Sequence, residues 1–103
     1  MDTQTQSMEI AKTIIQQVQY GDRWFLPAVG AKNFVALPES KEYQGGVRFS
    51  VNGQKHKGYV SIELRWVDDY TISFLGITGE VVKQFKGVFC DMLIDVLDYC
   101  EGK

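Results

Sequence analysis

The sequence predicts a two-layer α+β domain, in which an antiparallel β-meander of about five or six strands carries an N-terminal and a C-terminal helix on one face. Three observations predict this fold class. Apolar residues recur at helical spacing near both ends of the chain, and they alternate with polar residues in its middle part. Turn-forming pairs such as Asn52-Gly53 and Thr78-Gly79 separate the alternating segments, so we expect consecutive strands to pair as hairpins.

The first helix is expected to begin at Met8 and to end at Gly21, because glycine readily adopts the left-handed conformation that ends many helices. Its predicted buried face consists of Met8, Ala11, Ile14, Ile15 and Val18. Residues 1–7 are polar, and we expect them to be a disordered N-terminus before a single domain over residues 8–103.

Two short strands are expected after this helix. Residues 23–29 are rich in aromatic and β-forming side chains, and Pro27 would place that strand at a sheet edge because proline donates no ladder hydrogen bond. Gly30-Ala31 allows a reversal into a strand over residues 32–37. The polar segment 38–46 is predicted to be a loop within the domain.

The second half of the chain predicts four more strands, over residues 47–51, 59–66, 70–74 and 80–86. Asn52-Gly53, Asp68-Asp69 and Thr78-Gly79 are interpreted as the turns between them. In the second of these strands, the predicted core-facing side chains are Val60, Ile62, Leu64 and Trp66. We expect both tryptophans, Trp24 and Trp66, to be core residues.

A closing helix is expected over residues 87–101. Its predicted apolar face consists of Phe89, Met92, Leu93, Val96, Leu97 and Cys100. The opposite face forms an acidic ridge of Asp91, Asp95, Asp98 and Glu101, in which like charges repel on neighbouring turns. Two interpretations stay open: a surface for a basic partner, or ordinary solubilising charge.

Charge and cysteine content narrow the class of protein. Eleven basic and thirteen acidic residues give a net charge of −2, which argues against a generic DNA-binding surface. Cys90 and Cys100 lie too far apart on one helix to form a disulfide. With reduced thiols and no long apolar run, we expect a protein without a membrane segment in the cytoplasm of a bacterial host.

A second set of candidate residues surrounds the Asn52-Gly53 turn. Arg48, Lys55 and Lys57, with the outward-facing Tyr59, could bind nucleic acid by charge and base stacking, or they could simply keep a hairpin tip soluble. His56 is the only histidine, and no nucleophile or orienting acid accompanies it in the sequence, so we interpret it as a solvated turn residue. No motif for catalysis, a metal or a cofactor is present.

One family resemblance covers most of the chain. Ile10-Ala11, Thr13-Ile14, Gln16-Gln17, the hairpin from Gly30 to Val35, Asp69 to Phe74 and Gly87-Val88-Phe89 resemble a family of small uncharacterised bacteriophage and prophage proteins. The resemblance implies a helix, a hairpin, an antiparallel meander and a C-terminal helix. It implies a phage or mobile-element origin, and the family has no established biochemical activity.

These observations predict a non-enzymatic accessory protein, a monomer or homodimer without cofactor, that binds a host or phage protein. Inhibition of a bacterial defence system such as CRISPR is one concrete form that the resemblance suggests. We expect the partner to bind the acidic ridge or the strand edge near Pro27. The alternatives are a nucleic-acid-binding module and a protein that sequesters a small ligand such as a nucleotide.

Overall fold

The structure is a computed structural model that describes the backbone of residues 3–101 and the side chains of residues 8–100. Its elements are, in chain order, α1 (Thr3–Gly21), α2 (Phe25–Ala28), β1 (Lys32–Leu37), β2 (Tyr43–Asn52), β3 (Lys57–Arg65), β4 (Tyr70–Leu75), β5 (Val81–Val88), η1 (Cys90–Met92), α3 (Leu93–Leu97) and η2 (Asp98–Glu101). We call residues 90–101 the C-terminal helical segment.

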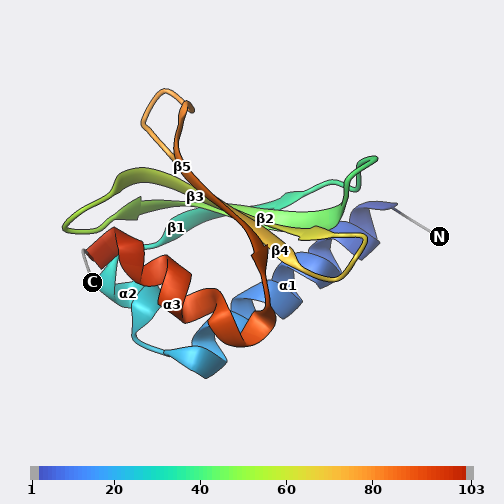
Figure 1. The fold of residues 1–103 in the computed structure, drawn as a ribbon, viewed down its shortest axis with the longest axis horizontal. Coiled ribbons are helices and arrows are strands. Elements are labelled where there is room, and N and C mark those ends of the chain that lie inside the picture. The colour runs from blue at the N-terminus through green and yellow to red at the C-terminus, as the bar shows by residue number, and fades with distance from the viewer. Residues whose placement is uncertain (1–2, 102–103) are drawn as a thin grey trace.

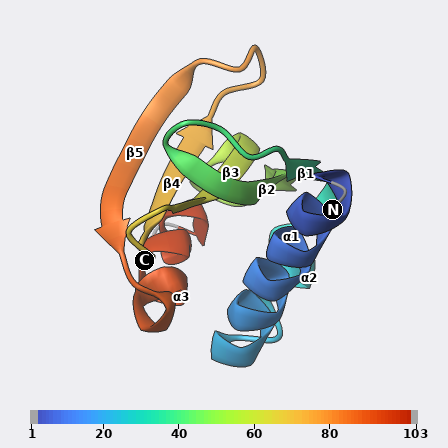
Figure 2. The same ribbon diagram turned by 90° about the vertical axis from the view of Figure 1, so that its right-hand side faces the viewer.

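The five strands form one antiparallel sheet in the order β1-β2-β3-β4-β5, so each strand pairs with its neighbour in the chain. Figure 1 shows the twisted sheet above the helices, and Figure 2 shows that α1 and α3 lie on the same face of it. The predicted α+β meander with both helices on one face is therefore confirmed. No helix in the described part of the chain is long and apolar enough to cross a membrane.

The core lies between the sheet and the two helical regions. Ala11, Ile14 and Val18 of α1 are buried as predicted, and α1 packs mainly on β1 and β2. On the other side, the Tyr99 ring lies 4.7 Å from that of Phe74 on β4, so the C-terminal helical segment covers this part of the sheet. Val60 and Ile62 of β3 are fully buried between the sheet and these two helical regions. The opposite face of the sheet has no helix on it (Figure 2).

The first helix is longer than the predicted one. It begins at Thr3, so residues 3–7 continue the helix that was expected to start at Met8. A residue added to an existing helix gains a hydrogen bond without the cost of nucleation, which allows a polar segment to extend it. Met8 is half exposed and does not belong to the buried face. Residues 1–2 of the expected disordered terminus lie outside the described residues.

The strand predicted over residues 23–29 is wrong, because the chain forms a turn and the short helix α2 there. The Asp22 carboxylate accepts a hydrogen bond from the Trp24 amide at 3.0 Å and starts the turn. Pro27 fits the first turn of a helix, where backbone N–H groups have no helical partner. Phe25, Leu26 and Val29 are buried, a helical spacing and not the alternation of a strand.

The turn between β2 and β3 also differs from the prediction. Asn52 pairs with Lys57, so four residues, Gly53 to His56, connect the strands in place of a two-residue Asn-Gly turn. The tip docks on the C-terminal helical segment, because the amides of Lys55 and His56 both donate to the Cys100 carbonyl, at 2.9 and 3.2 Å. A Cβ atom on Gly53 would lie 2.5 Å from that carbonyl oxygen, so the approach requires glycine.

His56 is buried in this contact, which corrects the prediction of a solvated turn residue. Its ring meets Phe74 edge-on, with centroids 5.4 Å apart, and its Nε2 atom lies 3.2 Å from the Tyr59 carbonyl oxygen. The histidine therefore packs the hairpin tip against the core, a structural role that the sequence pattern did not indicate.

The predicted helix over residues 87–101 begins later and is irregular. β5 continues to Val88, and a short α-helix then lies between two 3-10 turns. Leu93, Leu97 and Cys100 are buried as predicted, whereas Phe89 and Met92 are exposed. The change from 3-10 to α geometry alters the angle between successive side chains. A buried face predicted from α-helical spacing alone is therefore wrong for residues 89–92.

Neither tryptophan is a core residue, in contrast to the prediction: Trp24 is 66% exposed and Trp66 is 49% exposed. The Trp66 indole N–H donates to the Ser40 carbonyl oxygen at 3.1 Å and so holds the loop before β2. That loop is shorter than predicted, because β2 already begins at Tyr43.

Candidate functional site

The residues of the predicted acidic ridge differ in exposure. Asp91 and Asp95 are exposed and Asp98 is half-buried, while the side chain of Glu101 lies outside the described residues. The ridge crosses from η1 through α3 to η2, so its members do not follow one helical spacing. Asp91 and Asp95 remain available to solvent at the start of the segment.

The predicted nucleic-acid residues divide between two sides of the sheet. The Arg48 guanidinium lies over the Tyr59 ring, 5.7 Å from its centroid, on the face without helices. Lys55 instead lies 4.6 Å from the centroid of Tyr99, which belongs to the C-terminal helical segment. Lys57 is exposed at the start of β3. The structure therefore brings Arg48 and Tyr59 together but does not assemble all four residues into one patch.

The strand edge that was expected near Pro27 does not exist, because Pro27 lies in α2. The two free edges of the sheet are β1 and β5. β5 continues from a hairpin that projects from the body of the molecule (Figure 1), and Ile77, Val81 and Val82 are exposed there. Lys83 and Lys86 are exposed on the same strand, and charges of this kind oppose edge-to-edge pairing.

An apolar cleft lies where α1 meets the C-terminal helical segment. It has a volume of about 280 Å³, and its lining residues are Gln17, Tyr20, Gly21, Cys90, Asp91 and Ile94. A Cβ atom on Gly21 would lie 2.7 Å from Ile94 Cγ1, so the glycine allows the two helical regions to approach closely. Tyr20, which lines the cleft, is 96% exposed.

Large exposed side chains follow the lining residues along the chain. Trp24 comes three residues after Gly21, and Phe89 and Met92 flank Cys90 and Asp91; all three side chains are more than two-fifths exposed. We call Tyr20, Trp24 and Phe89 together the aromatic rim; Tyr20 lines the cleft, and the other two are near its lining residues in the chain. Exposed aromatic groups are typical of protein-binding surfaces.

Polar contacts fix the inner part of this cleft. The Tyr70 hydroxyl donates to Gln17 Oε1 at 2.6 Å and so joins β4 to α1. Burial raises the pKa of the Tyr70 phenol above its ordinary value, and the negative charge of a Cys90 thiolate would raise it further, whereas the hydrogen bond to Gln17 acts in the opposite direction. Tyr70 therefore stays a neutral hydrogen-bond donor, and Cys90 is an exposed free thiol beside it.

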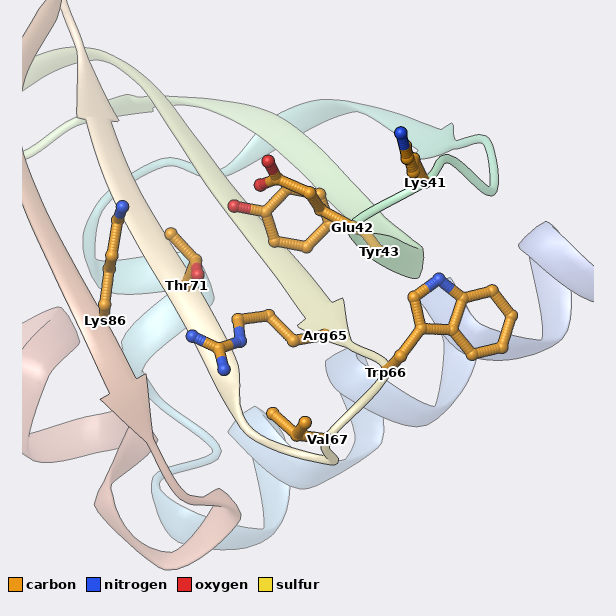
Figure 3. Close-up of a pocket in the computed structure, with 8 residues that line it drawn as sticks. All are labelled: Lys41, Glu42, Tyr43, Arg65, Trp66, Val67, Thr71 and Lys86. Atoms are coloured by element: carbon orange, nitrogen blue, oxygen red, sulfur yellow. The ribbon is translucent and has the colours of Figure 1, made fainter.

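A second cavity, of about 290 Å³, lies on the opposite face of the sheet, where the side chains of Glu42 and Tyr43 extend toward Thr71 of β4 (Figure 3). We call it the polar cavity. Its lining residues are Lys41, Glu42, Tyr43, Arg65, Trp66, Val67, Thr71 and Lys86. In Figure 3, Lys86 lies on one side of Thr71, while Glu42 and Tyr43 extend from the other side. The Arg65 side chain reaches in near Thr71, and its Nε atom lies 3.0 Å from Asp69 Oδ1.

Two features of the polar cavity are unusual for a plain sheet surface. Thr71 is only 1% exposed, and its hydroxyl oxygen has no hydrogen-bond partner among the described residues. Glu63 pairs with Thr71 across the strands. Burial raises the pKa of the Glu63 carboxyl above its ordinary value, and the charge of Glu42 raises it further, while a hydrogen bond with Ser61 acts in the opposite direction. Two carboxylates therefore repel each other at this side of the cavity.

Neither cavity was predicted from the sequence. The exposure of Tyr20 could have been predicted, because this aromatic residue lies off the apolar face of its amphipathic helix and therefore points away from the core. No feature of the sequence indicates the polar cavity, because the cavity depends on the strand register that places Thr71 beside Glu63 and on the conformation of the loop before β2. Within the described part of the chain, no three His, Cys, Asp or Glu side chains are grouped so that they could hold a metal ion.

The comparisons with known proteins give no family. No protein-family model, no curated protein and no solved structure matches the chain.

Proposed function

We propose that this protein is a non-enzymatic binding protein whose aromatic rim and apolar cleft bind a partner protein. The observation that carries the proposal is the exposure of Tyr20, at 96%, directly on an apolar cleft. Tyrosine and tryptophan are enriched among the residues that dominate binding energy, because they offer large apolar area at a low entropic cost. Trp24, at 66% exposed, adds a second group of this kind.

Charge around the cleft favours a partner segment that is basic as well as apolar. Asp91 lines the cleft, and Asp95 follows it four residues later on the exposed side of the C-terminal helical segment. Arg23, which precedes Trp24 in the chain, lies over the Trp24 ring at 5.3 Å from its centroid. An amphipathic helix with basic flanks would place apolar side chains in the cleft and cations beside the aspartates.

The resemblance to phage proteins extends the proposal to a host protein as the partner, and inhibition of a bacterial defence system such as CRISPR would be one outcome of that binding. This step rests on the resemblance alone, and the cytoplasm of the bacterial host is the location that goes with it.

The test is capture of partners from bacterial lysate on immobilised protein, followed by mass spectrometry. Wild type is compared with the double variant Tyr20→Ser/Trp24→Ser and with the control Ile77→Ser/Val82→Ser, which removes two other exposed apolar groups from the projecting hairpin. We expect wild type and the control to capture the same protein and the rim variant to lose it, with about tenfold weaker binding or more by calorimetry on the purified pair.

The control also tells which surface is used. Melting temperatures of all three proteins should agree closely, because every substituted side chain is exposed. Capture that survives the rim variant, or that disappears only with the hairpin variant, would contradict the proposal.

Nucleic-acid binding remains the second candidate, since Arg48 stacks on Tyr59 on the uncovered sheet face. Cation–aromatic pairs of this kind occur in proteins that stack bases of single strands. Fluorescence anisotropy with labelled single-stranded DNA and RNA at low ionic strength tests it. Binding that weakens steeply with salt, and with Arg48→Gln, would support this candidate; no binding at low salt removes it.

A further inference from the structure

The polar cavity carries charges of both signs, since Lys41, Arg65 and Lys86 are basic and Glu42 is acidic. Lys86 lies on one side of Thr71 and Glu42 on the other (Figure 3). Among the residues whose side chains are described, the only ion pair within 4.0 Å joins Arg65 to Asp69. Opposite charges that face one cavity without pairing leave both available to a ligand.

Thr71 provides a third contact point between these charges. Its side chain lines the cavity, is almost fully buried and leaves its hydroxyl oxygen without a partner in the described residues. Native proteins pair nearly all buried polar atoms, so an exception beside a cavity is a place where a ligand atom or a water molecule can complete the hydrogen bonding. The Tyr43 hydroxyl also points toward this region (Figure 3).

The charges discriminate between ligand classes. A phosphate or a simple carboxylate would meet Glu42 and, beside it, Glu63, while Lys41 leaves that side mixed in charge and Asp69 compensates the charge of Arg65. A simple amine would meet Lys86 on the other side. A molecule with one anionic and one cationic group satisfies both sides at once.

Size sets the remaining limit. A volume of about 290 Å³ lies at the lower end of the range for ligand pockets, so the occupant is a small metabolite and not a nucleotide with several phosphates.

We propose that the polar cavity binds a free α-amino acid. Lys86 and the Thr71 hydroxyl would hold its carboxylate, and Glu42 would hold its ammonium group. This proposal is independent of partner binding at the aromatic rim, because the two sites lie on opposite faces of the sheet.

The experiment is calorimetric titration of the protein with the common α-amino acids, with propionate and inorganic phosphate as anion-only probes and with propylamine as a cation-only probe. We expect at least one amino acid to bind and to raise the melting temperature in a concentration-dependent way, while the three single-charge probes give no heat.

Three variants separate a ligand site from a structural cluster. Thr71→Val keeps the shape and removes the hydroxyl; it should weaken amino-acid binding by about tenfold while raising the melting temperature of the ligand-free protein. Lys86→Gln and Glu42→Gln should each weaken binding to a similar extent. Lys83→Gln, an exposed lysine of β5 outside the cavity lining, is the charge-matched control and should bind as wild type does.

The outcomes that overturn the proposal are definite. Binding of phosphate or propionate alone would make the cavity an anion site, and no heat with any amino acid would exclude the ligand class. Amino-acid binding that survives all three cavity variants would place it elsewhere on the protein. A melting temperature that falls in Thr71→Val would mean that the hydroxyl already has a hydrogen-bond partner.

Discussion

Leu93 and Asp95 lie two residues apart in α3 and have opposite surroundings. Leu93 is 1% exposed in the core, whereas Asp95 is exposed. Leu93→Ala should lower the free energy of unfolding by about 2–5 kcal/mol, since it removes buried methyl groups and leaves a cavity. Asp95→Ala should change it by less than about 0.5 kcal/mol. Urea denaturation of both variants measures this difference, and equal effects would show that α3 is rotated about its axis.

Glu63 gives a prediction about pH. Its pKa in the folded protein is raised above the ordinary value of 4.5 by burial and by Glu42, so the folded protein binds its proton more tightly than the unfolded chain does. The contribution of Glu63 is therefore favourable at acidic pH and is lost as the pH rises through the raised pKa.

Glu63→Gln should remove this pH-dependent loss of stability, because glutamine carries no charge at any pH. We expect the variant to be more stable than wild type at neutral pH by a few tenths of a kcal/mol, because solvent screens a half-exposed carboxylate. The difference should shrink below the ordinary pKa of 4.5, where Glu63 is protonated in both states. Urea denaturation at several pH values between about 4 and 7 measures the trend, and a variant that is less stable than wild type at neutral pH would contradict it.

At the scale of elements, the docking of the β2–β3 tip on the C-terminal helical segment depends on Gly53. Its missing side chain allows the tip to reach the Cys100 carbonyl oxygen, which accepts from the Lys55 and His56 amides. Gly53→Ala should cost about 1–3 kcal/mol, as overpacking against backbone usually does. Gln54→Ala, at an exposed neighbouring position, should be nearly neutral.

Hydrogen exchange shows whether the contact itself is lost. In Gly53→Ala, the Lys55 and His56 amides should exchange faster than in wild type, while amides in the middle of β3 should change only as global stability requires. Unchanged protection of the two tip amides would mean that the chain adapts without undocking.

The elements also show what the sequence can predict. Strands β2 to β4 followed from alternation and turn pairs, because one face of each had to be buried. The prediction for residues 23–29 was wrong, because their aromatic content favoured a strand while the spacing of Phe25, Leu26 and Val29 was that of a helix. The burial of His56 and the polar cavity could not be predicted, because both arise where segments distant in the chain meet.

At the scale of the whole molecule, the sheet separates two surfaces of different chemistry. The helical side carries the apolar cleft and the aromatic rim, and the uncovered side carries the polar cavity. The two-layer arrangement explains why one chain can offer both, since an antiparallel sheet with helices on one face leaves its other face to solvent. A third surface remains in the free β5 edge and its projecting hairpin.

The free β5 edge gives a prediction about self-association. Its backbone groups have no neighbouring strand, and Val81 and Val82 are exposed beside Lys83. Lys83→Val should therefore promote pairing between two β5 edges, because it removes a charge that keeps an apolar edge from meeting a second copy. The control is Lys12→Val on the exposed side of α1, which changes the net charge equally. Light scattering during size-exclusion chromatography should show higher self-association for Lys83→Val than for the control, and equal behaviour of the two variants would assign any self-association to charge alone.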